Sequence, residues 1–409
     1  MRRSIARLTA AAAALAVVAA ASLSVGPAMV TPGQGQATVV PHPTATPRPA
    51  AGLPPPGAVD LPDAFWPIDQ GVPGVGSARP VDLLPIPAAQ AADLQAAVER
   101  ARATFGLGAV VVGVSADGRY GWSGASGPPR DGRTPLSGAT PFAIASVTKT
   151  FTAAIVLQLV DEGLVRLDAE VNDYLPELTV ARGVTVRQLL GHTSGIADLL
   201  APMRTRLNAE PSRTWTPGDV LALIGPSVFA PGSDWGYSNS NYVIAGMLVE
   251  RVTGHPFADE LDLRITGPLR LNGTGLAPDH GLPDLLGRSW SSAFWTSAAL
   301  DSDAIDLVRW GDALYGGAIL SPTALAHMLD FNANGYGLGA ERYSPNGLLG
   351  YGHSGLLRGF TSLLVHIPEA HLTLSVLATG HLFDPMALLT RGASDVPSIL
   401  ALARQIATP

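Results

Sequence analysis

A serine hydroxyl and a lysine amine lie three residues apart in Ser146-Val147-Thr148-Lys149, and together they suit nucleophilic catalysis. The chain has 26 lysine and arginine residues, and Lys149 is the single lysine among them. Arginine cannot lose its proton in a protein, whereas a buried lysine can lose it and act as a base. Residues three apart share one face of a helix, so a helix here would place the amine beside the hydroxyl. An exposed lysine that merely follows a serine is the alternative interpretation.

Two further short motifs hold groups that suit acyl transfer. Tyr237-Ser238-Asn239 supplies a phenol that can relay a proton and an amide that both donates and accepts hydrogen bonds. His353-Ser354-Gly355 precedes Leu356, whose backbone N–H would stabilise an oxyanion if a substrate lay along a strand here. Taken alone, the first motif is more typical of a turn with a packed tyrosine, and the second of a glycine-rich turn with a surface histidine.

The order and spacing of the three motifs resemble those of the serine penicillin-recognising family. This family comprises penicillin-binding DD-peptidases, serine β-lactamases and their esterase and peptidase relatives. The resemblance runs from Pro141 to Thr379, and it is to the class-C-like, low-molecular-weight branch. The segments that carry it are residues 142–150, 162–168 and 184–195, the last ending in His192-Thr193-Ser194-Gly195, together with Tyr237-Ser238-Asn239 and His353-Ser354-Gly355.

The resemblance implies an acyl-enzyme mechanism. Ser146 would attack an acyl carbonyl, while Lys149 and Tyr237 would share the removal of its proton and its delivery to the leaving group. Which of the two is the base stays open at the level of sequence. Asn239 would orient the substrate amide. The backbone N–H groups of Ser146 and Leu356 would form the oxyanion hole, and water would release the acyl group.

The third motif departs from class C β-lactamases, which have Lys-Thr-Gly there. His353 replaces a permanent cation near the substrate carboxylate, so efficient penicillin hydrolysis is not expected. Ser354 and Gly355 complete the expected substrate-binding strand. Arg358, and Arg342 in the preceding loop, are the candidates for binding a substrate carboxylate, although each also fits a solvated or structural arginine. His192 is expected to cap or pack a turn.

The elements that must position these residues follow from hydrophobic pattern and turn signals. Asp117-Gly118 between two β-type runs is a strong hairpin signal. The pattern predicts helices over 89–103, 146–162 and 241–253 and a last one over 396–406, and strands over 109–115, 120–123, 361–366 and 372–378. Thr216-Pro217 and Ser321-Pro322 each indicate a helix start. The fold class is therefore α/β (α+β): an antiparallel sheet built from both chain ends, flanked by helices, with an inserted, mostly helical domain as in the β-lactamase/transpeptidase-like fold.

The N-terminal region reads as an export signal followed by a linker. Residues 1–28 combine three arginines with an apolar run and are expected to be a signal peptide, with an uncleaved membrane anchor as the alternative. Residues 29–85 form a proline-rich linker and loop segment, with eight prolines between 31 and 60. The catalytic domain is expected over 86–409, with its helical insert over roughly 150–300. The protein would then be secreted or extracytoplasmic and associated with the cell envelope.

Composition excludes several classes of function. The net charge is −7, which argues against nucleic-acid binding, and no cysteine is present, which excludes disulfides and zinc–cysteine sites. Hydrophobic residues make up 47% of the chain, enough for a sizeable core. No cofactor and no metal is expected, and the chain is expected to be a monomer.

These observations favour a secreted serine hydrolase, most of all a D-alanyl-D-alanine carboxypeptidase-like enzyme. A β-lactamase or a carboxylesterase would use the same residues. A non-catalytic, wall-binding protein on the same fold is the alternative from another class. The substrate would be a peptide, a β-lactam or an ester, with cell-wall peptidoglycan as a partner. Residues 199–235 and 335–350 are expected to form the walls of the substrate pocket.

Overall fold

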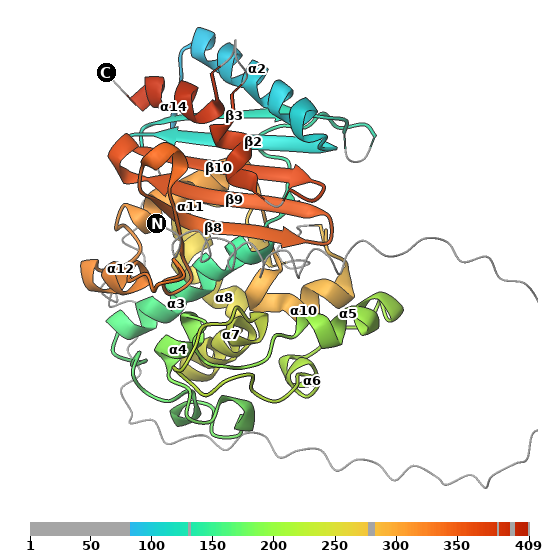
Figure 1. Cartoon of the computed structure of the whole chain (residues 1–409), viewed down its shortest axis with the longest axis vertical. Helices are drawn as coiled ribbons and strands as arrows, with labels where there is room; N and C mark the ends of the chain where they lie inside the picture. The colour runs from blue at the N-terminus through green and yellow to red at the C-terminus, as the bar shows by residue number, and fades with distance from the viewer. Residues whose placement is uncertain (1–81, 130–131, 277–282, 383, 393–396, 408–409) are drawn as a thin grey trace, which may run out of the picture. The chain divides into compact units, whose positions relative to one another are not determined.

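The computed structural model describes residues 82–129, 132–276, 283–382, 384–392 and 397–407. These residues form the expected α/β fold, with a mainly antiparallel sheet flanked by helices (Figure 1). The main sheet has seven strands in the order β1-β3-β2-β10-β9-β8-β7, and only the β1–β3 pair is parallel. The strands are β1 (Leu84–Pro85), β2 (Ala109–Ala116), β3 (Tyr120–Ser126), β7 (Glu341–Tyr343), β8 (Gly350–Leu357), β9 (Phe360–Ile367) and β10 (Leu372–Thr379).

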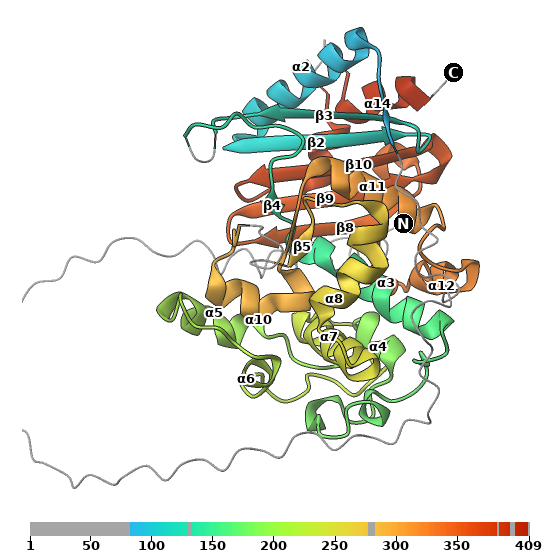
Figure 2. The same cartoon turned by 180° about the vertical axis from the view of Figure 1, so that it is seen from behind.

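The sheet joins the two ends of the folded region, as predicted. β2 and β10 pair over their full lengths. Side chains alternate between the two faces of a strand, and β2 is apolar on both: Val110 packs into one hydrophobic core and Val111 into the other. Helices α2 (Ala88–Phe105) and α14 (Ile399–Ala407) cover the first face, and α11 (Ala304–Tyr315) packs on the second (Figures 1 and 2).

The helical region packs around α3 (Thr148–Asp161), which carries Lys149. Every side chain of α3 from Thr148 to Leu159 is buried, because the helix is apolar nearly all round. Helices α7 (Asn239–Thr253) and α10 (Arg288–Ala298) pack directly on it. The other described α-helices are α4 (Val186–Leu190), α5 (Leu200–Ala209), α6 (Pro217–Leu221), α8 (Phe257–Leu261), α9 (Gly267–Leu269), α12 (Pro322–Met328) and α13 (Pro385–Thr390).

A small second sheet, which the sequence did not indicate, connects the main sheet to the helical region around α3. Its strands β4 (Phe142–Ala143), β6 (Leu300–Ser302) and β5 (Gly275–Leu276) pair in that order and are antiparallel. The strands hold only two or three residues each, too few for a periodic pattern. β4 leads directly into the segment of Ser146, so the small sheet fixes the entry of the chain to that residue.

Most predicted helices and strands are present, with shifted ends. Thr216 and Ser321 cap α6 and α12 as predicted. The prediction of a loop up to residue 85 was wrong at its end, because Leu84 and Pro85 form strand β1, which pairs with β3. Arg342 lies in strand β7 and not in a loop, because β7 pairs with β8. His353 lies inside β8.

The expected signal peptide over 1–28 lies outside the described residues, as does nearly all of the linker expected over 29–85. In the part of the chain that the structure describes, no helix combines the length and the apolar character needed to cross a membrane.

Candidate active site

Ser146 lies in a strained, tightly packed turn. It is the middle residue of the 3₁₀ helix Ala145–Val147, which leads into α3. The prediction that the α-helix includes Ser146 was therefore wrong, because α3 begins two residues later, at Thr148. Ala145 has a φ of 46°, a region that residues other than glycine seldom adopt. Strain of this kind is often held at functional sites by the surrounding packing. Here the Ser362 hydroxyl donates to the Ile144 carbonyl at 2.5 Å and ties the turn to β9.

Lys149 is fully buried in the first turn of α3. Its Nζ lies 3.1 Å from Ser146 Oγ, 2.8 Å from Asn239 Oδ1 and 2.9 Å from the Ser297 carbonyl oxygen. Burial lowers the pKa of Lys149 to about 7, against the opposing effect of the Asp198 and Glu341 carboxylates. A neutral amine keeps two N–H groups for Asn239 and Ser297 and turns its lone pair to Ser146. The amine can therefore accept the serine proton near neutral pH.

The carbonyl that holds Lys149 is made available by a distortion of α10. Trp295 has φ 35° and ψ −119°, which interrupts the helix. The carbonyls of the next two residues then turn toward α3: that of Thr296 accepts from the Thr152 hydroxyl at 2.7 Å, and that of Ser297 accepts from Lys149. Nothing in the sequence marked Ser297, because the role falls to a backbone carbonyl.

Asn239 connects Lys149 to a carboxylate that the sequence reading missed. Asp198 Oδ1 accepts the backbone N–H of Asn239 at 2.6 Å and its side-chain N–H at 3.0 Å. This contact fixes the amide so that its oxygen faces Lys149. Burial raises the pKa of Asp198, while the Asn239 hydrogen bonds oppose that rise. Asp198 is three residues past Gly195, and its closeness to the family-like segment 184–195 was the available signal.

Tyr237 completes the group around Ser146. The centre of its ring lies 4.8 Å from Lys149 Nζ, and its hydroxyl interacts with the Ser146 side chain. Burial raises the pKa of Tyr237 well above its ordinary value, so the phenol keeps its proton where Lys149 is already losing its own. The structure thus brings Ser146, Lys149 and Tyr237 together. The geometry favours Lys149 as the base and Tyr237 as a proton donor.

His192 packs against this group. Its ring centre is 4.3 Å from that of Tyr237, and its Nδ1 accepts the Ser238 N–H at 3.2 Å. Its φ of 59° places it in a tight turn. Burial lowers the pKa of His192 well below its ordinary value. Its contacts are those of a packing residue, in line with the sequence prediction.

The third motif provides the expected strand edge. A Cβ on Gly355 would lie 2.4 Å from the Ile144 carbonyl oxygen and 3.0 Å from the Ser146 nitrogen, so only glycine fits there. The Ser354 N–H donates to Glu341 and therefore points away from β9. N–H directions alternate along an antiparallel strand. The N–H of Leu356, two residues after Ser354, therefore points to the same edge of β8 as the Ser354 N–H. The Ser146 and Leu356 N–H groups thus both border the space beside Gly355, as an oxyanion hole requires.

His353 is buried and neutral. Its Nδ1 lies 2.6 Å from the Ser354 carbonyl oxygen, to which it donates, and its Nε2 lies 3.0 Å from the Tyr336 hydroxyl. Burial lowers the pKa of His353, and this effect outweighs the opposing influence of Glu341. His353 therefore brings no permanent cation to the site, as its residue type indicated.

The two candidate arginines make contacts elsewhere. Arg358 donates to the Leu286 carbonyl, and its guanidinium lies 5.3 Å from the Trp290 ring centre. Arg342 is exposed, and its guanidinium lies 5.9 Å from the Phe331 ring centre. The structure does not bring either side chain to Ser146. Two segments were expected to form the walls of the pocket. Residues 335–350 contribute Tyr336 and Glu341 to the site, and residues 199–235 contribute Trp235, whose ring centre lies 6.2 Å from that of Tyr336.

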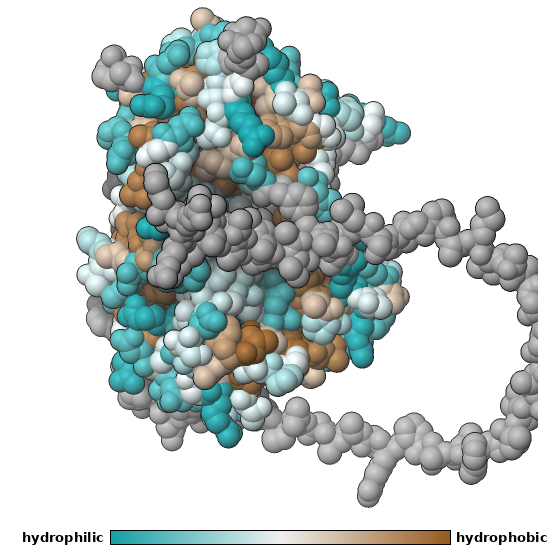
Figure 3. Space-filling view, viewed as in Figure 1, coloured by the Kyte–Doolittle hydropathy of each residue, from teal (hydrophilic) through white to brown (hydrophobic). Residues whose placement is uncertain are grey.

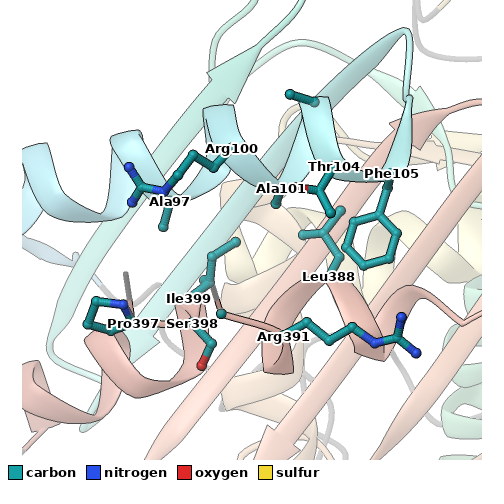
Figure 4. A pocket seen from close by; sticks show the side chains of 12 residues that line it. Ala97, Arg100, Ala101, Thr104, Phe105, Leu388, Arg391, Pro397, Ser398 and Ile399 are labelled. Carbon is teal, nitrogen blue, oxygen red and sulfur yellow. The ribbon is translucent and has the colours of Figure 1, made fainter. Parts of the chain in front are cut away.

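A separate hollow lies on the opposite face of the sheet. It is formed where α2 faces α13 and the start of α14, and its lining includes Ala101, Phe105, Leu388, Arg391, Ser398 and Ile399 (Figure 4). None of the motif residues lines it. On the face seen in Figure 3, hydrophobic residues lie in small groups among hydrophilic ones.

Comparison with known proteins gives a consistent result. The family described as Beta-lactamase matches residues 94–393. Penicillin-binding protein 4 of Amycolatopsis lactamdurans is 31% identical over 279 residues, which are 58% of this chain and 72% of that protein. A D-aminopeptidase of Cereibacter sphaeroides is 29% identical over 272 residues, 60% of this chain, and the chain spans only 51% of its length. The structure of a D-stereospecific amidohydrolase from Streptomyces sp. has a TM-score of 0.63 at 29% identity, covering 74% of this chain and 99% of that one.

The matched region contains all three motifs, and the fold places the Lys149 amine against Ser146 and Asn239 and the Gly355 backbone against Ser146. The chain therefore belongs to the β-lactamase family and is a serine hydrolase.

Proposed function

We propose that the protein hydrolyses an amide or ester bond through an acyl-enzyme on Ser146. The observation that carries this proposal is the Lys149 amine, which lies 3.1 Å from Ser146 Oγ with a pKa lowered by burial to about 7. Lys149 takes the serine proton as Oγ attacks the carbonyl carbon. The negative charge that develops on the carbonyl oxygen is stabilised by the N–H groups of Ser146 and Leu356.

The leaving group departs when the C–N or C–O bond of the tetrahedral intermediate breaks. Tyr237 donates its proton to the leaving atom and regains one from the protonated Lys149, whose Nζ lies 4.8 Å from its ring centre. Water then attacks the acyl-enzyme, passes one proton back toward Ser146 Oγ and releases the acid. General acid–base catalysis of this kind contributes a factor of about 10²–10⁴ to the rate.

The acyl group is proposed to be a D-amino-acid residue. Two of the similar proteins are named D-aminopeptidase and D-stereospecific amidohydrolase, and a third is named penicillin-binding protein. A D-alanyl-D-alanine carboxypeptidase, favoured by the sequence, would act on the same kind of acyl group but would release a residue with a free carboxylate. Secretion, association with the cell wall and the monomeric state stay predictions.

A non-catalytic binding protein is the less favoured alternative. Such a protein would have no use for a buried, neutral amine beside a serine, and burying an amine is costly. The test is hydrolysis of matched D- and L-alanine p-nitroanilides by the wild type and by Ser146→Ala. We expect cleavage of the D isomer, and its loss in the variant with unchanged thermal unfolding. Equal cleavage by both proteins would overturn the proposal.

Incubation with labelled penicillin, followed by mass spectrometry, separates the members of the family. A long-lived adduct on Ser146 supports a peptidase or amidase, and rapid turnover supports a β-lactamase. The absence of an adduct, together with cleavage of p-nitrophenyl esters, supports a carboxylesterase.

A further inference from the structure

The third motif is occupied by a carboxylate of the chain itself. Glu341 begins β7, and its Oε2 accepts the Ser354 N–H at 3.0 Å and the Ser354 hydroxyl at 3.0 Å. The Tyr343 hydroxyl also donates to it. Both polar donors of Ser354 are thereby used, so neither is left for a substrate carboxylate.

This carboxylate lies along the edge of β8 that a substrate would follow. β7 pairs with β8 only over Gly350–Gly352, and the chain before Glu341 turns inward, where a Cβ on Gly339 would lie 3.0 Å from the Lys149 carbonyl oxygen. Ser354 and Leu356 are two residues apart, which on a strand corresponds to about 7 Å. Glu341 therefore lies roughly this far from the oxyanion donor of Leu356.

The leaving group is the part of the substrate that points toward Glu341. Tyr237, proposed above as the proton donor to the leaving atom, has its ring centre 6.4 Å from that of His353 and 6.1 Å from that of Tyr336. His353 and Ser354 precede Leu356 on β8. A leaving atom beside Tyr237 thus continues toward the His353–Ser354 end of the strand, where Glu341 lies.

No permanent cation neutralises Glu341 in the described part of the chain. Among the described residues, its only ion-pair contact is with His353, whose Nδ1 is 3.9 Å from Oε1 and already donates to the Ser354 carbonyl. Arg342 is the next residue on β7, and its side chain lies over Phe331. An uncompensated carboxylate beside a partly desolvated site repels an anion and attracts a cation.

We propose that Glu341 is a specificity-determining residue, which disfavours leaving groups that carry a carboxylate and favours neutral or ammonium-bearing ones. The inference rests on the proposed acyl-enzyme function and narrows it. The enzyme would cleave amides, esters or internal peptide bonds, and it would act poorly on a terminal residue with a free carboxylate. It would therefore be an amidase or aminopeptidase and not a carboxypeptidase.

Esters with one acyl group and three leaving groups test this directly. The D-alanyl esters of meta-carboxyphenol, meta-carboxamidophenol and meta-(aminomethyl)phenol differ mainly in charge. In the wild type, kcat/KM should be highest for the ammonium ester and lowest for the carboxylate ester. The Glu341→Gln variant keeps an acceptor for Ser354 without the charge, and the ammonium-to-carboxylate ratio should fall by about tenfold at low salt.

Tyr343→Phe is the matched control, because it removes another hydrogen bond to Glu341 and leaves the charge in place. Its ratio should equal that of the wild type. A ratio that is the same in Glu341→Gln as in the wild type, or a wild type that prefers the carboxylate ester, would overturn the inference while leaving the acyl-enzyme intact. Failure of the acyl-enzyme itself would appear separately, as equal ester hydrolysis by the wild type and Ser146→Ala.

Discussion

Asp198→Asn tests how the site sets the protonation of its base. Asp198 reaches Lys149 only through Asn239, and its carboxylate raises the pKa of Lys149 against the larger, lowering effect of burial. An asparagine at 198 keeps an oxygen that can accept both Asn239 N–H groups, but it has no charge. The pKa of Lys149 should therefore fall. Since the unprotonated amine is the active base, the acid limb of kcat/KM should move to lower pH.

The size of the shift follows from the spacing of the charges. Lys149 Nζ is 2.8 Å from Asn239 Oδ1, and Asn239 Nδ2 is 3.0 Å from Asp198 Oδ1, so one amide group separates the two charges. At about 7 Å and an effective dielectric constant of about 20, two unit charges interact by about 2.4 kcal/mol. Asp198 is partly exposed, and screening by solvent reduces this to roughly half. Since about 1.36 kcal/mol equals one pH unit, the limb should move by about one unit.

The assay is the pH dependence of kcat/KM for a D-alanine p-nitroanilide between about pH 5 and 9, where Lys149 should titrate. In the wild type the rate should rise as pH passes through about 7, because Lys149 then loses its proton. Asp168→Asn is the control: it removes a carboxylate whose side chain is 83% exposed and pairs with Arg187. An unchanged limb in Asp198→Asn, or one that moves to higher pH, would refute the reasoning.

Two further variants test the remaining parts of the site. Lys149→Arg keeps a cation at this position, but an arginine cannot give up its proton. We therefore expect kcat to fall by about 10²–10⁴ and the acid limb near neutral pH to disappear, and a steady-state pH profile measures both effects. Leu356→Pro removes the proposed oxyanion N–H at a strand edge that tolerates proline, and kcat should fall by about 10²–10³, whereas Leu356→Ala keeps the N–H and should retain most of the activity. Equal activity of the Leu356 variants would remove Leu356 from the oxyanion hole.

The local chemistry of the site could be predicted from sequence because short motifs encode it. Ser146 and Lys149 are three residues apart at the entry to a helix, so their contact is set by the chain itself. β2 and β10 are rich in valine, leucine and alanine and are buried along nearly their whole lengths, so both could be placed within a residue or two. Gly355 was expected in the substrate-binding strand, and the structure adds its close approach to the Ile144 carbonyl and the Ser146 nitrogen, which only glycine permits.

The groups that tune the site could not be predicted, because they reach it through tertiary contacts. Asp198 meets Asn239 across 41 positions of sequence, and the Ser297 carbonyl meets Lys149 across 148. Glu341 reaches Ser354 only because β7 pairs with β8. Neither carboxylate lies within a motif, and a backbone carbonyl has no residue type to recognise. The charge balance around Lys149 therefore had to come from the structure.

The protonation of Lys149 can be measured without any substrate. Because the sequence contains a single lysine, a sample labelled with ¹⁵N at the lysine side chain gives one Nζ signal. We predict that this signal titrates with a pKa of about 7, and that Ser146→Ala leaves it in the neutral range. Titration near the ordinary lysine value, about 10.4, would mean that the amine is charged beside Ser146 at neutral pH and would contradict its role as the base.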